Sequence, residues 1–269
     1  MTSLGGTRIL SPVAFPGRRA TRLIERNLFV YRRLWLVLLS GFFEPLFYLL
    51  AVGFGVGSLI GAIEGPGGKA VAYPLFVAPA MLAASAMNGA IFDATFNFFS
   101  KLKEDKLYDA VLVTPLSVAD VAVGEVGWAL TRGTLYAVGF LAAMLALGLI
   151  ASPWAILALP AALFIGFAFA ALAMAGATFM RKWTDFDYIF LVTLPLFLFS
   201  ATFFPLSAYP AELRFVVQLS PLYHGVELLR GLTLGAVGPH LLVHVAYLGA
   251  LGTVGVAVVG RRLGKLLLK

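Results

Sequence analysis

Six long apolar runs dominate the chain, and polar segments separate them. Each run is close to or above the roughly 20 residues that a helix needs to cross a membrane. Hydrocarbon offers no partners to backbone polar groups, and the runs lack the alternation of barrel strands, so they predict helices. The pattern predicts an all-α integral membrane protein with six transmembrane helices, at Leu34–Leu59, Ala70–Phe99, Val121–Ala151, Trp154–Met180, Tyr188–Phe204 and Leu241–Gly260.

Lys and Arg are concentrated in alternate segments between these runs. Most of the 20 basic residues lie in the N-terminal segment, the second and fourth gaps and the C-terminal tail. Cytoplasmic segments carry the excess of Lys and Arg, so we expect both termini in the cytoplasm. The net charge of +7 then lies along one membrane face. Anionic membrane lipids account for it, and we expect no nucleic-acid partner.

Composition supports the membrane interpretation. Hydrophobic residues make up 61% of the chain and charged residues 12%, with a mean hydropathy of +0.94, whereas soluble domains carry about 25% charged residues. The chain has no cysteine, which excludes disulfides, thiol nucleophiles and thiolate metal sites. The first apolar run follows a long Arg-rich stretch and is long enough to stay in the membrane, so we expect no cleavable signal peptide.

The N-terminal segment has two parts. Met1–Pro16 is rich in Gly, Ser, Thr and Pro and is predicted to be flexible. Residues 17–33 interleave apolar residues with arginines, Arg22 and Arg26 among them, at helical spacing. This pattern predicts an amphipathic interfacial helix ahead of a transmembrane domain over 34–269. It is either a simple topological anchor or an elbow that also contacts a cytoplasmic partner.

The second inner segment predicts a short surface helix at about 101–110. Leu102, Leu107 and Tyr108 can share one face with Val111, because they recur at helical spacing. Thr114-Pro115 ends this helix, since the residue before proline avoids the α region. The segment is either an ordered loop or a peg that transmits motion from a soluble motor. Its opposite face carries Lys103, Glu104, Asp105 and Asp109.

Four ionisable residues lie within or beside the apolar runs, where charge is costly and marks structure or function. Glu44 precedes Pro45 in the first run. Asp93 lies two turns before Lys101 and is interpreted as a solvated carboxylate near the inner boundary. Glu125 and Arg132 are seven apart on one helix face, which allows a mutual ion pair. A structural ion pair is favoured over a transport-coupled site.

The outer segment at about 205–238 is too polar to cross the membrane again. Its Leu and Val content predicts two short helices that dip into the outer leaflet, a re-entrant segment before the last span. Its polar candidates are Tyr223, His224, Glu227 and Arg230.

Catalytic and phosphate-binding motifs are absent from the sequence. There is no GK[ST] phosphate loop, no HExxH and no GxSxG. His240 and His244 have the spacing of a metal pair, but no carboxylate is near in sequence, so we expect helix capping and packing. We therefore expect no catalytic or metal site and no cofactor bound by this chain. The 23 phenylalanines suit an apolar or sugar-bearing ligand, although filling helix contacts is the simpler role for most.

Three stretches resemble the membrane subunit of ABC type-2 exporters. LYDAVLVTPLS at Leu107–Ser117 resembles the inner-loop signature of this family. DVAVGEVGWALTRG at Asp120–Gly133 follows it as in the nodulation-factor (NodJ-like) branch. FFPLSAYPAELRFVVQLSPLYHGVELLRGLTLG at Phe203–Gly235 resembles the signature before the last helix. The daunorubicin-resistance branch is similar, so the branch is less sharply defined than the family.

The resemblance implies a bacterial plasma-membrane permease that exports an amphiphile: a lipid, a lipo-oligosaccharide or polysaccharide, or a hydrophobic drug. Such subunits pair with a second copy or a sibling permease, and each docks on a separate ATP-binding subunit, two per complex. ATP and Mg would bind that partner. Glu104, Asp105 and Tyr108 are expected on the exposed part of the peg. The full expected docking set is Arg22, Arg26, Lys101, Glu104, Asp105 and Tyr108.

Two other classes of function stay open. An autonomous secondary transporter or channel would use inverted repeats and charges at the midplane; no clear repeat is seen. An intramembrane enzyme acting on lipids would need a convergent acid, base or metal site, for which His224 with Glu227 is the only weak candidate.

Overall fold

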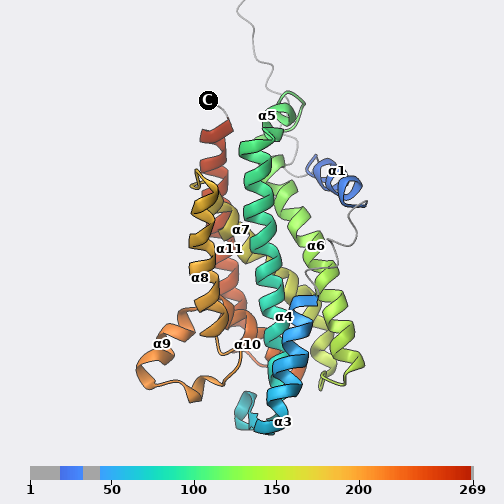
Figure 1. Ribbon diagram of the computed structural model, residues 1–269, viewed down its shortest axis with the longest axis vertical. Helices are drawn as coiled ribbons and strands as arrows, with labels where there is room; N and C mark the ends of the chain where they lie inside the picture. Colours follow the sequence, from blue (N-terminus) through green and yellow to red (C-terminus); the bar gives the residue numbers. More distant parts are fainter. Residues whose placement is uncertain (1–18, 33–42, 268–269) are drawn as a thin grey trace, which may run out of the picture.

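The computed structural model describes residues 19–32 and 43–267. The predicted flexible segment Met1–Pro16 lies outside the described residues, as do the ends of the 17–33 segment and the beginning of the first apolar run. The described chain is an elongated bundle of helices (Figure 1). Its only strands among these residues are two three-residue ones, so the all-α prediction is confirmed in its main point.

Five helical stretches are long and apolar enough to cross a membrane: Phe43–Ile60, Tyr73–Glu104, Val118–Ala146, Pro153–Ala177 and Leu241–Leu267. The predicted sixth span does not reach this length. Helix α8 covers Asp187–Leu198, only 12 residues. At 1.5 Å per residue it is about 18 Å long, against a hydrocarbon core of about 30 Å. The structure therefore does not confirm six full-length transmembrane helices.

Helix α4 (Tyr73–Phe92) is the centre of the bundle, with nearly every side chain from Phe76 to Met87 buried. Helices α6 (Val118–Ala146) and α7 (Ala158–Ala177) pack against it, and α11 (Leu241–Leu267) packs on α7 and α6. Helix α7 contacts α4, α6 and α11 and so ties the bundle together. Alanine and glycine let these helices approach closely, which stabilises helix pairs in membranes.

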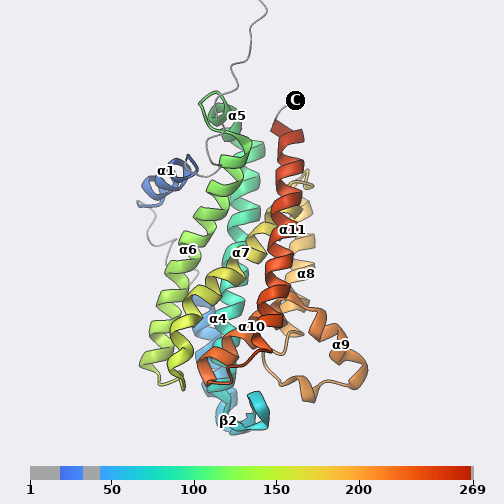
Figure 2. The ribbon, with the colours of Figure 1, turned by 180° about the vertical axis from the view of Figure 1, so that it is seen from behind.

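At one end of the bundle lie the short helix α3 (Gly57–Ile60) and a hairpin of β1 (Ala62–Glu64) and β2 (Ala70–Ala72), paired antiparallel. The same end carries α9 (Ala211–Leu219) and α10 (Pro221–Leu234), so the predicted 205–238 segment does contain two short helices. Helix α10 packs against α4, α7 and α11, whereas α9 extends sideways from the bundle (Figures 1 and 2).

The opposite end carries α1 (Thr21–Tyr31), α5 (Leu107–Leu112) and the end of α11 (Figure 1). Helix α4 reaches it through two π-helical segments, Asp93–Asn97 and Ser100–Glu104. The predicted single helix at 101–110 is therefore wrong in its bounds. Its first residues prolong α4, and Lys106, in the left-handed region at φ 46°, separates them from α5.

Helix α5 ends before Thr114-Pro115, as predicted. Helix α6 then begins with a capping box, because the Ser117 hydroxyl accepts from the Asp120 backbone N–H at 3.1 Å and the Asp120 carboxylate accepts from the Ser117 backbone N–H at 2.9 Å. This reciprocal cap fixes the point at which the chain turns back along the bundle.

Candidate functional site

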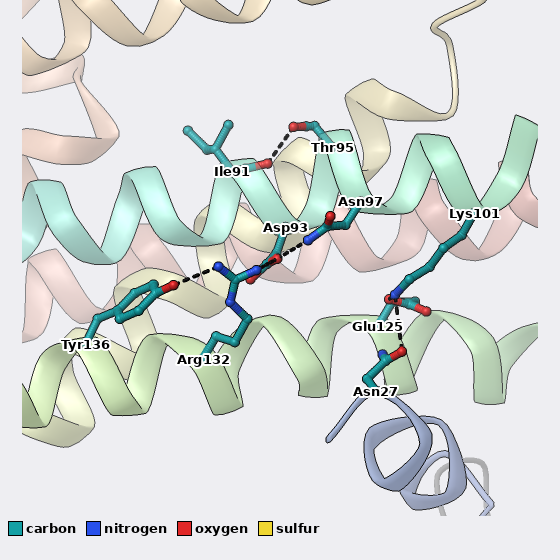
Figure 3. A network of polar contacts seen from close by, with 9 residues as sticks. All are labelled: Asn27, Ile91, Asp93, Thr95, Asn97, Lys101, Glu125, Arg132 and Tyr136. Carbon is teal, nitrogen blue, oxygen red and sulfur yellow. Dashed lines mark hydrogen bonds and ion pairs between the residues drawn. The ribbon is translucent and has the colours of Figure 1, made fainter. Parts of the chain in front are cut away.

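A buried ion pair joins α4 to α6 (Figure 3). Arg132 donates from Nη1 to Asp93, and the Asn97 amide donates to the same carboxylate oxygen. Arg132 also donates from Nη2 to the Tyr136 hydroxyl at 2.7 Å. Asp93 is only 4% exposed, so its interpretation as a solvated interfacial carboxylate is wrong. The cause is Arg132, which compensates the buried charge from a neighbouring helix.

A second ion pair lies closer to the α1 end. Lys101 Nζ is 2.7 Å from Glu125 Oε2 and 3.5 Å from Asn27 Oδ1 on α1, so it connects α4, α6 and α1 (Figure 3). The expected pair between Glu125 and Arg132 is therefore wrong, since each has a different partner. Positions seven apart are separated by about 10 Å along a helix, and side chains of α4 reach both of them more closely.

Helix α1 lies against α6 at two glycines. A Cβ at Gly124 would be 2.8 Å from Leu23 Cδ1, and one at Gly127 would be 2.8 Å from Ile24 Cδ1. Leu23 and Asn27 are buried, while Arg22 and Arg26 are exposed. The described part of the 17–33 segment is thus an amphipathic helix, as predicted. Leu23 and Ile24 hold this helix on α6, whereas its arginines and the apolar residues Leu28, Phe29 and Val30 are exposed.

Tyr31, at the end of α1, reaches the ion pair of Arg132. The Arg132 guanidinium carbon is 5.3 Å from the centre of the Tyr31 ring, and that ring is 5.1 Å from the ring of Trp128. A cation near an aromatic face is attracted to it. Helix α1 is therefore in contact with both buried ion pairs.

Glu104, expected as an exposed docking residue, has an internal partner. Its carboxylate accepts a 2.6 Å hydrogen bond from the Trp183 indole, between α7 and α8. Trp183 lies 5.2 Å from Phe99 and 5.1 Å from Phe186 between ring centres. Glu104 thus secures the end of α4 to the loop between α7 and α8. Glu104 and Asp105 are both exposed, but Asp105 makes no such bond.

Tyr108 is 1% exposed, so its expected place on the exposed part of the peg is wrong. Its ring packs 5.6 Å from that of Phe98, because α5 folds back on the π-helical end of α4. Burial, and then the nearby Glu125 carboxylate, raise the pKa of Tyr108 well above its ordinary value. Tyr108 anchors α5 to the bundle and leaves Asp105 and Asp109 on the surface.

The loop between α7 and α8 is held by Asp185. Its carboxylate accepts from the backbone N–H groups of Arg181, at 2.7 Å, and Lys182, at 3.1 Å. These hydrogen bonds favour the ionised form and lower the pKa of Asp185. The loop is therefore an ordered turn that positions Trp183 against Glu104.

A cavity of about 680 Å³ lies between the first span, α4, α6 and α8. Its volume is in the range of ligand pockets. Two of the sequence-predicted charges, Glu44 and Arg132, line it, whereas Glu125 does not. Its other polar lining residues are Ser85, Asn88, Tyr136 and Thr193, and its aromatic ones are Tyr48, Phe92, Phe96, Phe190 and Phe197.

In the 205–238 segment, Arg230 is the central residue and is 1% exposed. It donates to Glu227 at 2.6 Å, to the Ala201 carbonyl at 2.8 Å and to the Phe76 carbonyl at 3.3 Å. Its guanidinium also lies 3.7 Å from the centre of the Phe76 ring. Arg230 therefore fastens α10 to α4 and to the loop after α8, a role that its position in the sequence does not reveal.

His224 and Tyr223 belong to an aromatic group where α10 meets α11. His224 and His244 share a 2.8 Å hydrogen bond between their Nδ1 atoms, and His224 stacks 3.8 Å from Tyr247. Tyr223 lies 5.6 Å from His224. Glu227 is paired with Arg230 and not with His224. Within 19–32 and 43–267, no cluster of three or more possible metal ligands occurs.

The bundle, its buried ion pairs and its cavity define a polytopic membrane protein of the transport class. Residues 19–234 match the model of the ABC-2 type transporter family, and the chain belongs to that family. It is the membrane permease component of such a transporter, rather than the ATPase. This confirms the family inferred from the signature stretches.

Three relatives cover most of the chain. Nodulation protein J of Rhizobium meliloti (strain 1021) is 29% identical over 226 residues, which are 83% of this chain and 84% of the relative. Nodulation protein J of Rhizobium leguminosarum bv. trifolii is 32% identical over 230 residues, 84% of each chain. Nodulation protein J of Neorhizobium galegae is 32% identical over 222 residues, 80% of this chain and 79% of the relative. The NodJ-like branch is thereby confirmed.

Proposed function

We propose that this permease moves an amphiphile outward across a bacterial plasma membrane, driven by a separate ABC ATPase subunit on its inner face. The observation that carries the proposal is the construction of the α1–α5 end. Both helices are fixed to the bundle on one side, through Leu23 and Tyr108, and expose charges on the other. The complex would contain two ATPase subunits, which bind ATP and Mg, and two permeases, either identical or siblings.

The buried ion pairs supply a route from this surface to the cavity. Asp105 and Asp109 flank Tyr108 on the α5 side. Lys101, just before them, is bonded to Glu125 and Asn27. Two turns further into the bundle, the Asp93–Arg132 pair lies beside the cavity. Motion of α1 and α5 would thus shift α4 relative to α6, and packed interiors transmit such shifts as discrete rearrangements.

The path of the chain supports six crossings, although only five helices have the full length. Helix α8 begins at the same end of the bundle as α5 and runs toward α9, while α11 begins at the α9 end (Figure 1). A crossing between Asp187 and Leu241 would account for this path. We propose that α8 makes the inner half of this fifth crossing and that α9 and α10 form a re-entrant outer segment, held in place by Arg230. Both termini are then cytoplasmic.

A pull-down from gently solubilised native membranes tests the partner. A tagged chain should bring down an ABC ATPase in stoichiometric amount. Recovery of the chain alone in several detergents, together with transport driven by a proton gradient, would instead support the alternative, an autonomous secondary transporter. In the pairs Asp93–Arg132 and Lys101–Glu125 each charge is already compensated, so neither pair offers a free charge to a coupling ion.

A docking variant tests the surface itself. Asp105→Lys with Asp109→Lys reverses two exposed charges and leaves Tyr108 in place. In the co-expressed complex we expect normal yield of permease but loss of the bound ATPase and of stimulated ATP hydrolysis. Glu104 is left unchanged, since its bond to Trp183 would confuse docking with folding. The matched control is Glu212→Lys, an exposed carboxylate on α9 at the opposite end. Control-level hydrolysis in the docking variant would refute the assignment.

A further inference from the structure

The cavity between the first span, α4, α6 and α8 carries one charge without an internal partner. Arg132 lines it, but this guanidinium is paired with Asp93 and bonded to Tyr136. Glu44 lines it from the first span and is exposed. Among the described residues, the Glu44 carboxylate forms no ion pair and accepts no hydrogen bond. Among the described residues, the charged groups that line the cavity or pair with its lining are Glu44, Arg132 and Asp93, and of these the Glu44 carboxylate is left uncompensated.

Aromatic side chains form the rest of its walls. Phe92 and Phe96 stack at 5.1 Å between ring centres on α4, and Phe190 of α8 lies 6.1 Å from Phe96. On the other side Tyr48 meets Phe197 edge to face at 5.7 Å. Such rings offer flat faces to an apolar or aromatic body and attract cations.

The cavity lies midway along the α4 span. Its lining residues on that span run from Met81 to Phe96, within the stretch Tyr73–Glu104. Tyr48, 42% exposed, and Phe190, 62% exposed, mark its open side between the first span and α8. A molecule with an apolar body can therefore enter from the membrane, while its polar end reaches Glu44.

We propose that this cavity binds a cationic amphiphile, with its amine at Glu44 and its body between the aromatic walls. A volume of about 680 Å³ accommodates a drug-sized molecule of this kind. An anionic headgroup is disfavoured by the uncompensated carboxylate, because like charges in a low dielectric repel strongly. The inference rests on the proposed export function only for the further statement that the bound molecule is cargo.

The test is binding of rhodamine 6G, a cationic amphiphile with a planar body, to the full chain in phosphatidylcholine nanodiscs. Fluorescence polarisation should show saturable binding by the wild type. Glu44→Gln should weaken it roughly two- to fivefold, the scale of a partly exposed charge pair. Glu44→Asp should retain most of the affinity. Glu212→Gln, which removes an exposed carboxylate outside the cavity, should bind as the wild type does.

A second variant locates the site independently of charge. Asn88 is an exposed residue that lines the cavity. The larger side chain of Asn88→Trp would occupy part of the cavity volume. We expect it to weaken rhodamine binding as well. Dansyl-undecanoic acid, an anionic amphiphile, should bind the wild type less tightly than rhodamine does, and Glu44→Gln should reduce this difference.

Three results would overturn the proposal: no saturable rhodamine binding, equal affinity in the wild type and Glu44→Gln, or full displacement of the dye from both by the neutral amphiphile dodecyl maltoside at equal concentration. The last result would show that an uncharged sugar headgroup binds as well as a cationic one, so that Glu44 does not select for positive charge. None of these experiments contains an ATPase. If rhodamine does not bind but the ATPase is pulled down, the cavity proposal fails and the export function stands. If rhodamine binds but no ATPase is pulled down, the binding site stands and the proposed ATPase partner fails.

Discussion

Asp93 and Arg132 show how a buried charge is tolerated in this bundle. Each is more than nine-tenths buried, and each is bonded to a polar neighbour besides its ion partner: Asn97 for Asp93 and Tyr136 for Arg132. Removing one member of such a pair is costly, since the other charge is left uncompensated. The pair also adjoins the cavity, because Arg132 lines it.

A double-mutant cycle distinguishes the pair in the structure, Asp93 with Arg132, from the pair expected from spacing along α6, Glu125 with Arg132. We expect Asp93→Asn and Arg132→Gln to be strongly coupled, by about 1–3 kcal/mol, whereas Glu125→Gln and Arg132→Gln should be additive within about 0.5 kcal/mol. The measurement is the free energy of unfolding in mixed micelles, titrated with SDS. A larger coupling for Glu125 with Arg132 would contradict the arrangement in Figure 3.

The sequence singled out the four charged residues of the two ion pairs, Asp93, Lys101, Glu125 and Arg132, but it did not identify how they pair. Spacing along one helix relates only residues of that helix, and it suggested Glu125 with Arg132. The actual partners come from α4, 39 residues before Arg132 and 24 before Glu125. Tyr108 illustrates the same limit. Its helical spacing from the neighbouring apolar residues predicted a shared apolar face. Only the packing of α5 on Phe98 shows that Tyr108 is buried there.

At the scale of the helix, α7 and α11 approach each other closely. A Cβ at Gly255 would lie 2.6 Å from the backbone carbonyl carbon of Ala171, a contact that only glycine avoids. Gly252 faces the ring of Phe167 in the same interface. Close backbone approach at small residues stabilises helix pairs in membranes, where no hydrophobic driving force exists between helices.

Alanine at Gly255 should therefore push α7 and α11 apart and lower stability. The matched control is Gly260→Ala on the same helix, whose Cβ would meet nothing within 4 Å. Alanine there should be neutral or stabilising by roughly 0.5–1 kcal/mol, because it has the higher helix propensity. Thermal unfolding in detergent compares the two. If Gly255→Ala unfolds at or above the temperature of Gly260→Ala, the α7–α11 contact is not as described.

Element boundaries were predicted where they have a local cause and missed where they do not. The end of α5 before Thr114-Pro115 follows from proline sterics. The end of α8 at Leu198 has no such signal, since Pro195 lies inside the helix. Beyond it, Ala201 adopts φ 54° and its carbonyl accepts from Arg230, so a contact from α10 determines where the helix stops. The break in the helix at Lys106 likewise could not be predicted, because no glycine, asparagine or proline marks it in the sequence.

For the whole molecule, the sequence and the structure agree on which ends of the helices belong together. The charged segments at Lys101–Lys106, Arg181-Lys182 and Arg261-Arg262 adjoin the ends of α4, α7 and α11 that lie with α1 and α5 (Figures 1 and 2). This is the arrangement that the positive-inside rule requires. What the runs alone did not reveal is that the helix of the fifth run, α8, ends at Leu198, and that α10 of the following segment packs into the bundle.

The absence of cysteine makes the topology directly measurable, because each introduced thiol is the only one in the chain. With a membrane-impermeant maleimide on intact cells, we expect labelling of Lys69→Cys, beside the β1–β2 hairpin, and of Glu212→Cys on α9. Val113→Cys, 89% exposed after α5, and Arg261→Cys on α11 should label only after the membrane is opened.

Glu212→Cys is the decisive position, because it follows α8. A chain with five crossings would leave α9 on the same side as Val113, and Glu212→Cys would then stay unlabelled in intact cells while Lys69→Cys reacts. Labelling of both from outside requires the chain to cross between Asp187 and Ala211, although α8 supplies only 12 helical residues for it. The remaining distance must be covered by protein-shielded backbone, and the Arg230 bonds to the carbonyls of Ala201 and Phe76 provide that shielding.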